Sequence, residues 1–296
     1  MLIRDSRMSD AGALLQWRND PQSRAMFSNS SIITDDEHRC WYQQALSSEK
    51  THFYIGEDQS DRFGVCRFDI SQDEKRAEVS INLNPKYRGK GLSRELLDRS
   101  ILAFQERYPL ELTARVKRAN EASLRIFKQA GFTTDSVDTV YRHLVLPPAN
   151  FTYQAVTCAH APILYQLLKN REHKISHEIL PSYEEHERFV RNHPYKHWYL
   201  VSQKKPIGTI YIQNDNSIGL NLENIAATGL KQIMTFLADK HSPLPPIPSV
   251  RPKKFFFNLS PTNRNLIYLM GVLGNQLIQI SYDMQSLTKG TDNAFN

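Results

Sequence analysis

The sequence of 296 residues has few of the features that mark disulfide-rich, metal-binding or membrane proteins. Its three cysteines, Cys40, Cys66 and Cys158, form no C-x-x-C pair and have no histidine cluster near them, which argues against a disulfide framework or a structural zinc site. No apolar run approaches the roughly 18 residues that a membrane span requires. The first ten residues are polar and lack the apolar stretch of a signal peptide. We therefore expect a cytoplasmic protein with no bound metal and no membrane partner.

Two common nucleotide-binding signatures are also missing. The sequence contains neither the G-x-x-x-x-G-K-[ST] pattern of a P-loop nor the G-x-G-x-x-G pattern of a dinucleotide-binding turn. The net charge is +6, of which +1 falls in residues 1–150 and +5 in residues 151–296. The basic residues form no block and do not alternate with aromatic residues, so a solvated basic surface is favoured over nucleic-acid binding. We expect no nucleic-acid partner.

The order of predicted elements indicates an α/β fold with a mixed sheet. Short strand-like runs cover residues 52–56, 63–70, 78–83, 110–116 and 140–146, and helical patterns separate or follow them. Thr34 and Glu37 have the spacing of a capping box, which predicts that a helix begins there. Pro147 and Pro148 interrupt the pattern and form the clearest boundary in the chain. We predict one domain over residues 1–146 and a second over residues 150–290.

The second half repeats the first in the same order. The matching segments are residues 14–19 with 167–172, 36–41 with 184–189, 52–55 with 197–200, 64–66 with 208–210, 80–83 with 219–222, and 120–131 with 263–274. Six similarities in one order indicate two copies of one fold. The copies differ after the third predicted strand, where the first has a glycine pair and residues 223–227 (ENIAA) have none. We therefore expect the second copy to be degenerate and to support the first structurally.

Residues 88–93 (RGKGLS) lie between a predicted strand and a predicted helix. Glycines allow a sharp turn and a close approach of the backbone to a ligand. The free N–H groups at a helix N-terminus favour an anion. The segment is thus either a pyrophosphate cradle or an ordinary turn with two glycines.

The motif and the segment that follows it resemble the GNAT superfamily of acyl-CoA-dependent N-acyltransferases. Arg88, Gly91 and Ser93 occupy the fixed places of the family pattern [RQ]-x-x-G-x-[GA], from which Ser93 departs. Residues 120–132 match the family pattern N-x-x-[AS]-x-x-x-[YF]-x-x-x-G-F. The resemblance implies two tandem GNAT-like domains, of which the first uses acetyl-CoA. It implies that these residues bind the cofactor: Leu83 through its backbone to the pantetheine arm, Arg88, Gly89, Lys90, Gly91, Leu92 and Ser93 through their amides to the pyrophosphate, and Asn120 and Phe127 near the thioester.

Residues 17–21 (WRNDP) and the spacing Glu37-His38-x-x-Trp41 resemble one branch of this family. That branch acetylates amino groups on nucleotide-activated sugars, as the acetyltransferases of the pseudaminic-acid pathway do. The resemblance implies that Trp17, Arg18, His38 and Trp41 contact the acceptor. Core packing for the two tryptophans, and capping or ion pairing for Arg18 and His38, are the alternatives.

The resemblance also implies a direct transfer from the thioester to an amine, which needs a general base and a proton for the leaving thiolate. Glu78 lies where many members of the family have a catalytic glutamate, and a solvated strand residue is the alternative. The usual acidic tyrosine is replaced by Phe127, so Tyr141 or water would protonate the thiolate. We expect an N-acetyltransferase acting on a small amine, preferably a nucleotide-linked amino sugar for surface glycans, in a monomer or homodimer. The alternatives are a protein N-acetyltransferase of the ribosomal type and a non-catalytic acyl-CoA-binding protein.

Overall fold

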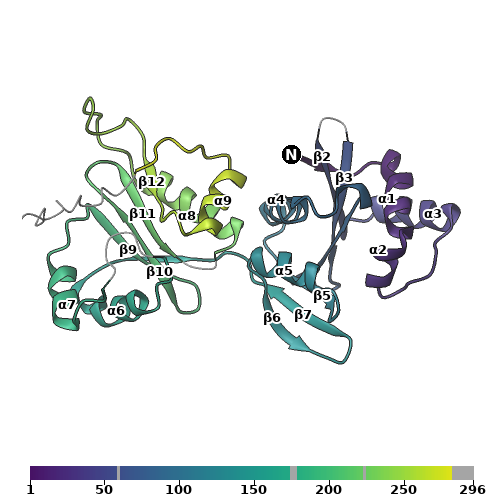
Figure 1. The fold of residues 1–296 in the computed structure, drawn as a ribbon, viewed down its shortest axis with the longest axis horizontal. Coiled ribbons are helices and arrows are strands. Elements are labelled where there is room, and N and C mark those ends of the chain that lie inside the picture. Colours follow the sequence, from purple (N-terminus) through teal and green to yellow (C-terminus); the bar gives the residue numbers. More distant parts are fainter. Residues whose placement is uncertain (59–60, 174–178, 223–224, 282–296) are drawn as a thin grey trace, which may run out of the picture.

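The chain builds two β-sheets that follow one another in the sequence (Figure 1). The computed structural model describes residues 1–58, 61–173, 179–222 and 225–281. The predicted α/β fold with mixed sheets is confirmed. In these residues, no helix is long and apolar enough to cross a membrane. The first sheet ends with a strand that finishes at Leu146 and the second begins at Thr152, so the break in the fold falls at Pro147 and Pro148.

The first sheet has the strand order β1-β2-β3-β4-β5-β7-β6. Its strands are β1 (Leu2–Asp5), β2 (Thr51–Asp58), β3 (Asp61–Ile70), β4 (Arg76–Leu83), β5 (Glu111–Lys117), β6 (Thr133–Val137) and β7 (Tyr141–Leu146). Neighbouring strands are antiparallel except β4 and β5, which are parallel.

The second sheet repeats this arrangement. Its strands are β8 (Thr152–Ala155), β9 (His197–Ser202), β10 (Pro206–Ile212), β11 (Ser217–Leu222) and β12 (Phe256–Asn258), paired in that order. Three antiparallel pairs are again followed by one parallel pair, β11 with β12. Strand order and direction therefore agree with the repeat that the sequence predicts, although the described part of the second half has no counterpart of the β6–β7 hairpin.

Helices cover both faces of the first sheet. They are α1 (Ala11–Asn19), α2 (Pro21–Met26), α3 (Asp35–Leu46), α4 (Leu92–Arg107) and α5 (Glu121–Gln129), with short 3-10 helices at Met8–Asp10 and Pro85–Tyr87. Helices α1 and α3 pack on β2 and β3 through a small core that contains Trp17 and Phe53. Helices α4 and α5 cover the other face through the main core, where the rings of Phe68 and Phe104 stack 4.3 Å apart.

The second half has a similar set of helices: α6 (Ala161–Lys169), α7 (Tyr183–Arg191), α8 (Ala227–Lys240) and α9 (Arg264–Val272), with a 3-10 turn at Cys158–His160. By position they correspond to α1, α3, α4 and α5. Helices α8 and α9 pack on the sheet through a core that includes Leu230 and Leu266. The proline-rich segment 243–252 is neither helix nor named strand, as its prolines predict.

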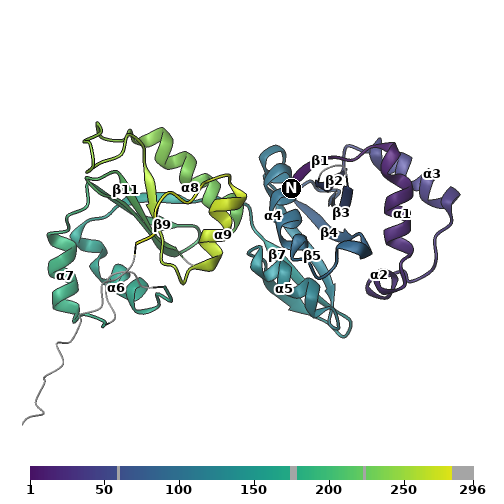
Figure 2. The ribbon, with the colours of Figure 1, turned by 45° about the horizontal axis from the view of Figure 1, so that its top comes forward.

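Helix α4 also joins the two halves, because it lies on the side of the first sheet that faces the second half (Figures 1 and 2). Leu102 packs into the core of the second half. The Arg94 guanidinium lies 3.9 Å from the centre of the Tyr268 ring and donates a hydrogen bond to Asn265. Cation–π contacts of this kind contribute about 1–2 kcal/mol when they are partly desolvated.

Some helix ends are where the sequence predicts them, whereas other local features could not be predicted. Thr34 and Glu37 form the expected capping box, and Asn120 caps α5, which ends before Gly131 at a φ of 99°. Helix α2 is too short to be recognised from its periodicity. Asp10 is the N-cap residue of α1 but makes no side-chain cap bond to that helix, and its carboxylate forms buried ion pairs with Arg4 and Arg62. Burial raises the pKa of Asp10, but hydrogen bonds from Arg4, the Arg7 amide and Arg62 outweigh it and lower the pKa to about 2.

Asp98 on α4 provides a test of this interface. Its side chain is 1% exposed, and burial raises its pKa to about 6 despite the ion pair with Arg94 at 3.4 Å. The folded protein thus holds this proton more tightly than the unfolded chain does, so the contribution of Asp98 to stability is most favourable below about pH 4 and declines as the pH rises through 6. A shift of this size corresponds to about 3 kcal/mol. We expect Asp98→Asn to gain this amount relative to wild type between pH 4 and pH 7, measured by urea unfolding.

The control is Asp35→Asn, which removes an exposed carboxylate that is also paired with an arginine four residues away. Its stability relative to wild type should change little over the same pH range. An identical pH dependence in wild type and Asp98→Asn would contradict the assignment.

Candidate functional site

The parallel pair of strands in the first sheet separates part of the way along its length. Strands β4 and β5 are paired at only three positions, of which Glu78 with Thr113 is the last. Beyond that point β4 continues to Leu83 and β5 to Lys117 without pairing to each other. Backbone N–H and C=O groups need hydrogen-bond partners. The split therefore offers the edge of β4 to an extended ligand that carries amide groups.

A turn that contains two glycines lies at the open end of this split. Gly89 and Gly91 have φ values of 75° and 76°, a conformation that favours glycine, and Gly91 is the N-cap of α4 with no side-chain cap. A Cβ added to either glycine would meet no atom within 4 Å, so the space in front of the backbone is open. The first N–H groups of a 16-residue helix point into this space and favour a phosphate group.

The other residues of the turn support it in different ways. Arg88 donates hydrogen bonds to Asp20 at 2.6 Å and to Ser23 at 2.7 Å, so its guanidinium ties the turn to α2. The Lys90 ammonium lies 4.7 Å from the centre of the Tyr87 ring. Leu92 and Ser93 form the first turn of α4, and Leu83 is the last residue of β4. The Arg88 amide already donates a hydrogen bond to the Pro85 carbonyl at 3.3 Å, so the prediction that it binds a pyrophosphate is not supported, whereas the same prediction for the amides of residues 89–93 stays a prediction.

Asn120 and Phe127, the two residues predicted to lie near the thioester, each stabilise α5. The Asn120 side chain accepts a hydrogen bond from the Ser123 amide at 3.0 Å and caps the helix. The Phe127 side chain is 2% exposed, and its ring contacts Phe132 edge to face at 5.0 Å. Phe127 therefore faces the main core, and its contact with a cofactor stays a prediction.

Arg115 links the two predicted catalytic residues on the other face of the sheet. Its Nε donates to Glu78 Oε1 at 3.0 Å, and this bond raises the pKa of Arg115, with a smaller electrostatic contribution from Tyr141. The Tyr141 hydroxyl donates to Ser28 Oγ at 3.0 Å. Arg115 was not singled out by the sequence. The alternation of Thr113, Arg115 and Lys117 with apolar residues in β5 is the signal that could have identified it.

The four predicted acceptor contacts are divided between the core and the surface. Trp17 is buried in the small core, and His38 is buried against Tyr42 with its Nδ1 lacking a hydrogen-bond partner among the described residues. Burial also lowers the pKa of His38. Trp41 is 39% exposed and lies under the guanidinium of Arg67, 5.0 Å from the ring centre. Trp41 is thus accessible, whereas Trp17 follows the packing alternative.

Positive charge accumulates where α2 and the following segment approach the end of β5. The Arg18 side chain donates to the carbonyl of Asn29, Arg24 to those of Asn19 and Ser30, and Lys117 to that of Ala25. Within the described ranges, none of these three cations has a carboxylate partner. Burial, together with the charge of Arg24, lowers the pKa of Arg18. This surface therefore favours an anionic group.

No group of three or more His, Cys, Asp or Glu residues in the described part of the chain is arranged to hold a metal ion. The candidate site consists of three features: the split between β4 and β5, the glycine turn at the N-terminus of α4, and a polar face of the sheet that carries Glu78, Arg115 and Tyr141.

Comparisons with known proteins bear on the same half of the chain. Residues 1–133 match the family model described as "Acetyltransferase (GNAT) domain". No curated protein matches the sequence. Three similar solved structures are an N-acetyltransferase from Staphylococcus aureus Mu50 (20% identity, 49% of this chain and 97% of that one, TM-score 0.43), a ribosomal-protein-alanine N-acetyltransferase from Brucella melitensis (19%, 50% and 99%, 0.44), and a spermidine N-acetyltransferase from Vibrio cholerae with CoA and spermine (16%, 49% and 94%, 0.45). Residues 1–133 are thus similar in sequence to GNAT acetyltransferase domains.

Proposed function

We propose that the N-terminal half binds acetyl-CoA in the split between β4 and β5 and transfers its acetyl group to the amine of a nucleotide-linked amino sugar. The observation that carries this proposal is the parting of β4 and β5 after Glu78, with Gly89, Gly91 and the N-terminus of α4 at the open end. The pantetheine amides would pair with the edge of β4 up to Leu83. The pyrophosphate would accept hydrogen bonds from the amides of residues 89–93.

The reaction needs few groups beyond those that hold the substrates. The amine loses a proton to Glu78, directly or through a water molecule, and its nitrogen attacks the thioester carbonyl. The new C–N bond forms, the C–S bond breaks, and Tyr141 or water returns a proton to the thiolate of CoA. Arg115 holds the Glu78 carboxylate in place through the hydrogen bond at 3.0 Å. Placing both reactants in one groove supplies much of the rate enhancement.

The positive charge of Arg18, Arg24 and Lys117, on the side of the sheet where we place the acceptor, favours an anionic substrate. Arg18, Arg24 and Lys117 bind backbone carbonyls, so their charge is not neutralised by a neighbouring carboxylate in the described structure. Such a surface attracts the phosphates of a nucleotide-linked sugar and repels a polyamine such as spermidine. Trp41 and Arg67 offer a ring and a guanidinium on the same side of the sheet.

The choice of acceptor can be tested by CoA release. We expect release with a UDP-linked amino sugar and little with spermidine or an alanine-terminated peptide. Lys117→Glu should raise KM for the UDP-linked sugar about tenfold while changing kcat less, because the contact acts on binding. Lys253→Glu, at an exposed lysine in a bend of the second half, is the control for net charge. Release with the peptide alone would favour protein acetylation instead.

The cofactor site can be tested at Gly91. Gly91→Asp would place a carboxylate in front of the α4 N-terminus, whereas Gly91→Asn has the same shape and no charge, and asparagine tolerates positive φ better than most residues. We expect acetyl-CoA to bind wild type at one site per chain by calorimetry, and the Asp variant to bind at least tenfold more weakly than the Asn variant. Equal affinity of the two variants would exclude the pyrophosphate from this turn.

The proposed role of Glu78 as general base can be tested by comparing its substitution with the substitution of another glutamate that is paired with an arginine. Glu78→Gln keeps the shape of the side chain and removes its basicity, so kcat/KM should fall about 100-fold. Glu111→Gln breaks a similar exposed pair, with Arg76 at 2.8 Å, and should leave kcat/KM within about twofold. A loss below threefold in Glu78→Gln would transfer the role of base to water or to another residue.

A further inference from the structure

The side chain of Arg88 contacts helix α2 at three points. Since the Arg88 amide bonds to the Pro85 carbonyl, the guanidinium is the part of this residue that reaches a distant element. It donates hydrogen bonds to Asp20 Oδ2 at 2.6 Å, to Ser23 Oγ at 2.7 Å and to Gln22 Oε1 at 3.0 Å. Asp20 is the N-cap residue of α2, and the other two lie in its first turn. The rigid fork of a guanidinium thus fixes the start of this helix.

Helix α2 has little else to hold it in place. None of residues 20–34, all of which the structure describes, belongs to the apolar cores of the first half. Ser23 is the one buried residue of the helix, and it donates a hydrogen bond to Asn82 Oδ1 on β4 at 3.0 Å. The helix has six residues, and isolated helices of this length are not stable in water. Its position therefore depends mainly on polar contacts, among which those of Arg88 include the ion pair with Asp20.

The other end of α2 contacts the side of the sheet where we place the acceptor. Lys117 donates a hydrogen bond to the carbonyl of Ala25 at 2.9 Å, and Tyr141 donates one to Ser28 just after the helix. Arg24 lies on the helix itself. A shift of α2 would therefore displace Arg24 and break the contacts of Lys117 and Tyr141. Helix α2 thus connects the glycine turn with the acceptor side.

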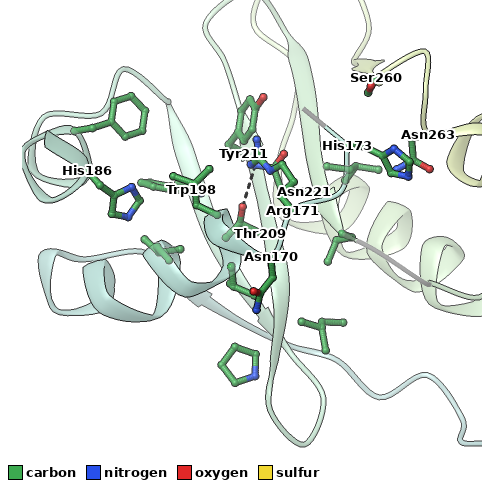
Figure 3. A pocket seen from close by; sticks show the side chains of 18 of the residues that line it. Asn170, Arg171, His173, His186, Trp198, Thr209, Tyr211, Asn221, Ser260 and Asn263 are labelled. Atoms are coloured by element: carbon green, nitrogen blue, oxygen red, sulfur yellow. Dashed lines mark hydrogen bonds between the residues drawn. The ribbon is translucent and has the colours of Figure 1, made fainter. Parts of the chain in front are cut away.

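The second half has an open space at the position that corresponds to α2. Asn221, the residue of β11 that corresponds to Asn82, lines a cavity of about 490 Å³ and donates a hydrogen bond to Thr209 at 3.3 Å (Figure 3). The described residues between α6 and α7, which are 170–173 and 179–182, form no helix. A sheet of this kind thus folds without a helix at this position. We conclude that the fold alone does not require α2.

The second half also lacks the glycine turn to which Arg88 belongs. Residues 223–227 contain no glycine, and two of them, Glu223 and Asn224, lie outside the described residues. The N-cap residue of α8, Ala226, packs against Gly131 of the first half, where an added Cβ would lie 3.0 Å from the Ala226 Cβ. In the described structure, the helix and the turn therefore occur together in one half and are both missing from the other. This pairing favours a function for the contact between them.

We propose that Arg88 is a positioning residue for the acceptor and not a contact of the cofactor. Its guanidinium holds α2 at the place where Arg24 and the bonds of Lys117 and Tyr141 complete the acceptor side. The proposal rests on the proposed function, since it assumes that the polar face beside the split receives the acceptor. It assigns the arginine of a cofactor motif to the second substrate.

Three variants of the full chain separate a role in acceptor binding from a role in cofactor binding. Arg88→Met keeps the length of the side chain and removes its donors. Asp20→Asn removes the ion pair but retains a side chain that caps helices well. Arg99→Met is the control, because it breaks the pair with Glu95 at 2.8 Å elsewhere in the first half, and the Arg99 side chain is 29% exposed against 27% for Arg88.

Hydrogen–deuterium exchange and calorimetry test the assignment without an acceptor. The amides of residues 23–27 should exchange about fivefold faster or more in Arg88→Met and in Asp20→Asn, and at the wild-type rate in Arg99→Met. The affinity for acetyl-CoA should stay within about fivefold of wild type in all three variants, because the contact that is lost does not involve the cofactor. Wild-type exchange of α2 in Arg88→Met, or a larger loss of acetyl-CoA affinity, would each overturn the proposal.

Kinetics then test the effect on the acceptor that gives CoA release. Its KM should rise about tenfold in Arg88→Met and in Asp20→Asn, while kcat and the KM for acetyl-CoA change less. The double variant should be no worse than the more affected single variant, because both substitutions break the same contact. Additive effects, or a rise in the KM for acetyl-CoA alone, would contradict the assignment. Absence of CoA release with every acceptor would overturn the proposed function instead, and the exchange of α2 would still decide whether Arg88 positions this helix.

Discussion

A parallel strand pair that ends after three positions is the constraint on which the rest of this protein depends. Backbone groups beyond Glu78 on β4 and beyond Thr113 on β5 do not meet across the gap. Apolar packing cannot satisfy such groups, so the opening has to be filled by water or by a ligand that brings its own amides. The parallel pair of β11 and β12 also has three positions, but there β12 ends at the third, Asn258, and only β11 continues, to Leu222.

Helix α4 contacts three different parts of the molecule, and these contacts account for the distribution of its apolar and charged residues. Its N-terminus lies at the opening of the first sheet, one side carries Leu97 and Phe104 into the main core, and a second side carries Arg94 and Leu102 to the second half. A helix with two buried sides has only a weak amphipathic pattern. Asp98 lies on the side that faces the second half, as a buried carboxylate between Arg94 and Leu102. The ion pair thus belongs to the joint between the halves and not to the candidate site.

The sequence predicted the features that depend on local chemistry. The mixed α/β fold, the capping box at Thr34 and the end of α5 before Gly131 follow from patterns a few residues long. The pairing of Arg88 with Asp20, and of Arg115 with Glu78, joins residues tens of positions apart and depends on how the elements pack. For the same reason Trp17 could be placed on a helix but not assigned to the core. The cavity of the second half has no motif, since its walls come from six separate segments.

The contact between Gly131 and Ala226 limits what the second copy could become. The first half presses its own backbone onto the α8 N-terminus, and glycine at position 131 is required both for its φ of 99° and for the 3.0 Å approach that a Cβ would make. Replacing residues 223–227 with a glycine-rich turn would therefore not restore a second nucleotide pocket while the halves remain joined. The packing of the first half on the second thus blocks the position that corresponds to the first half's own glycine turn.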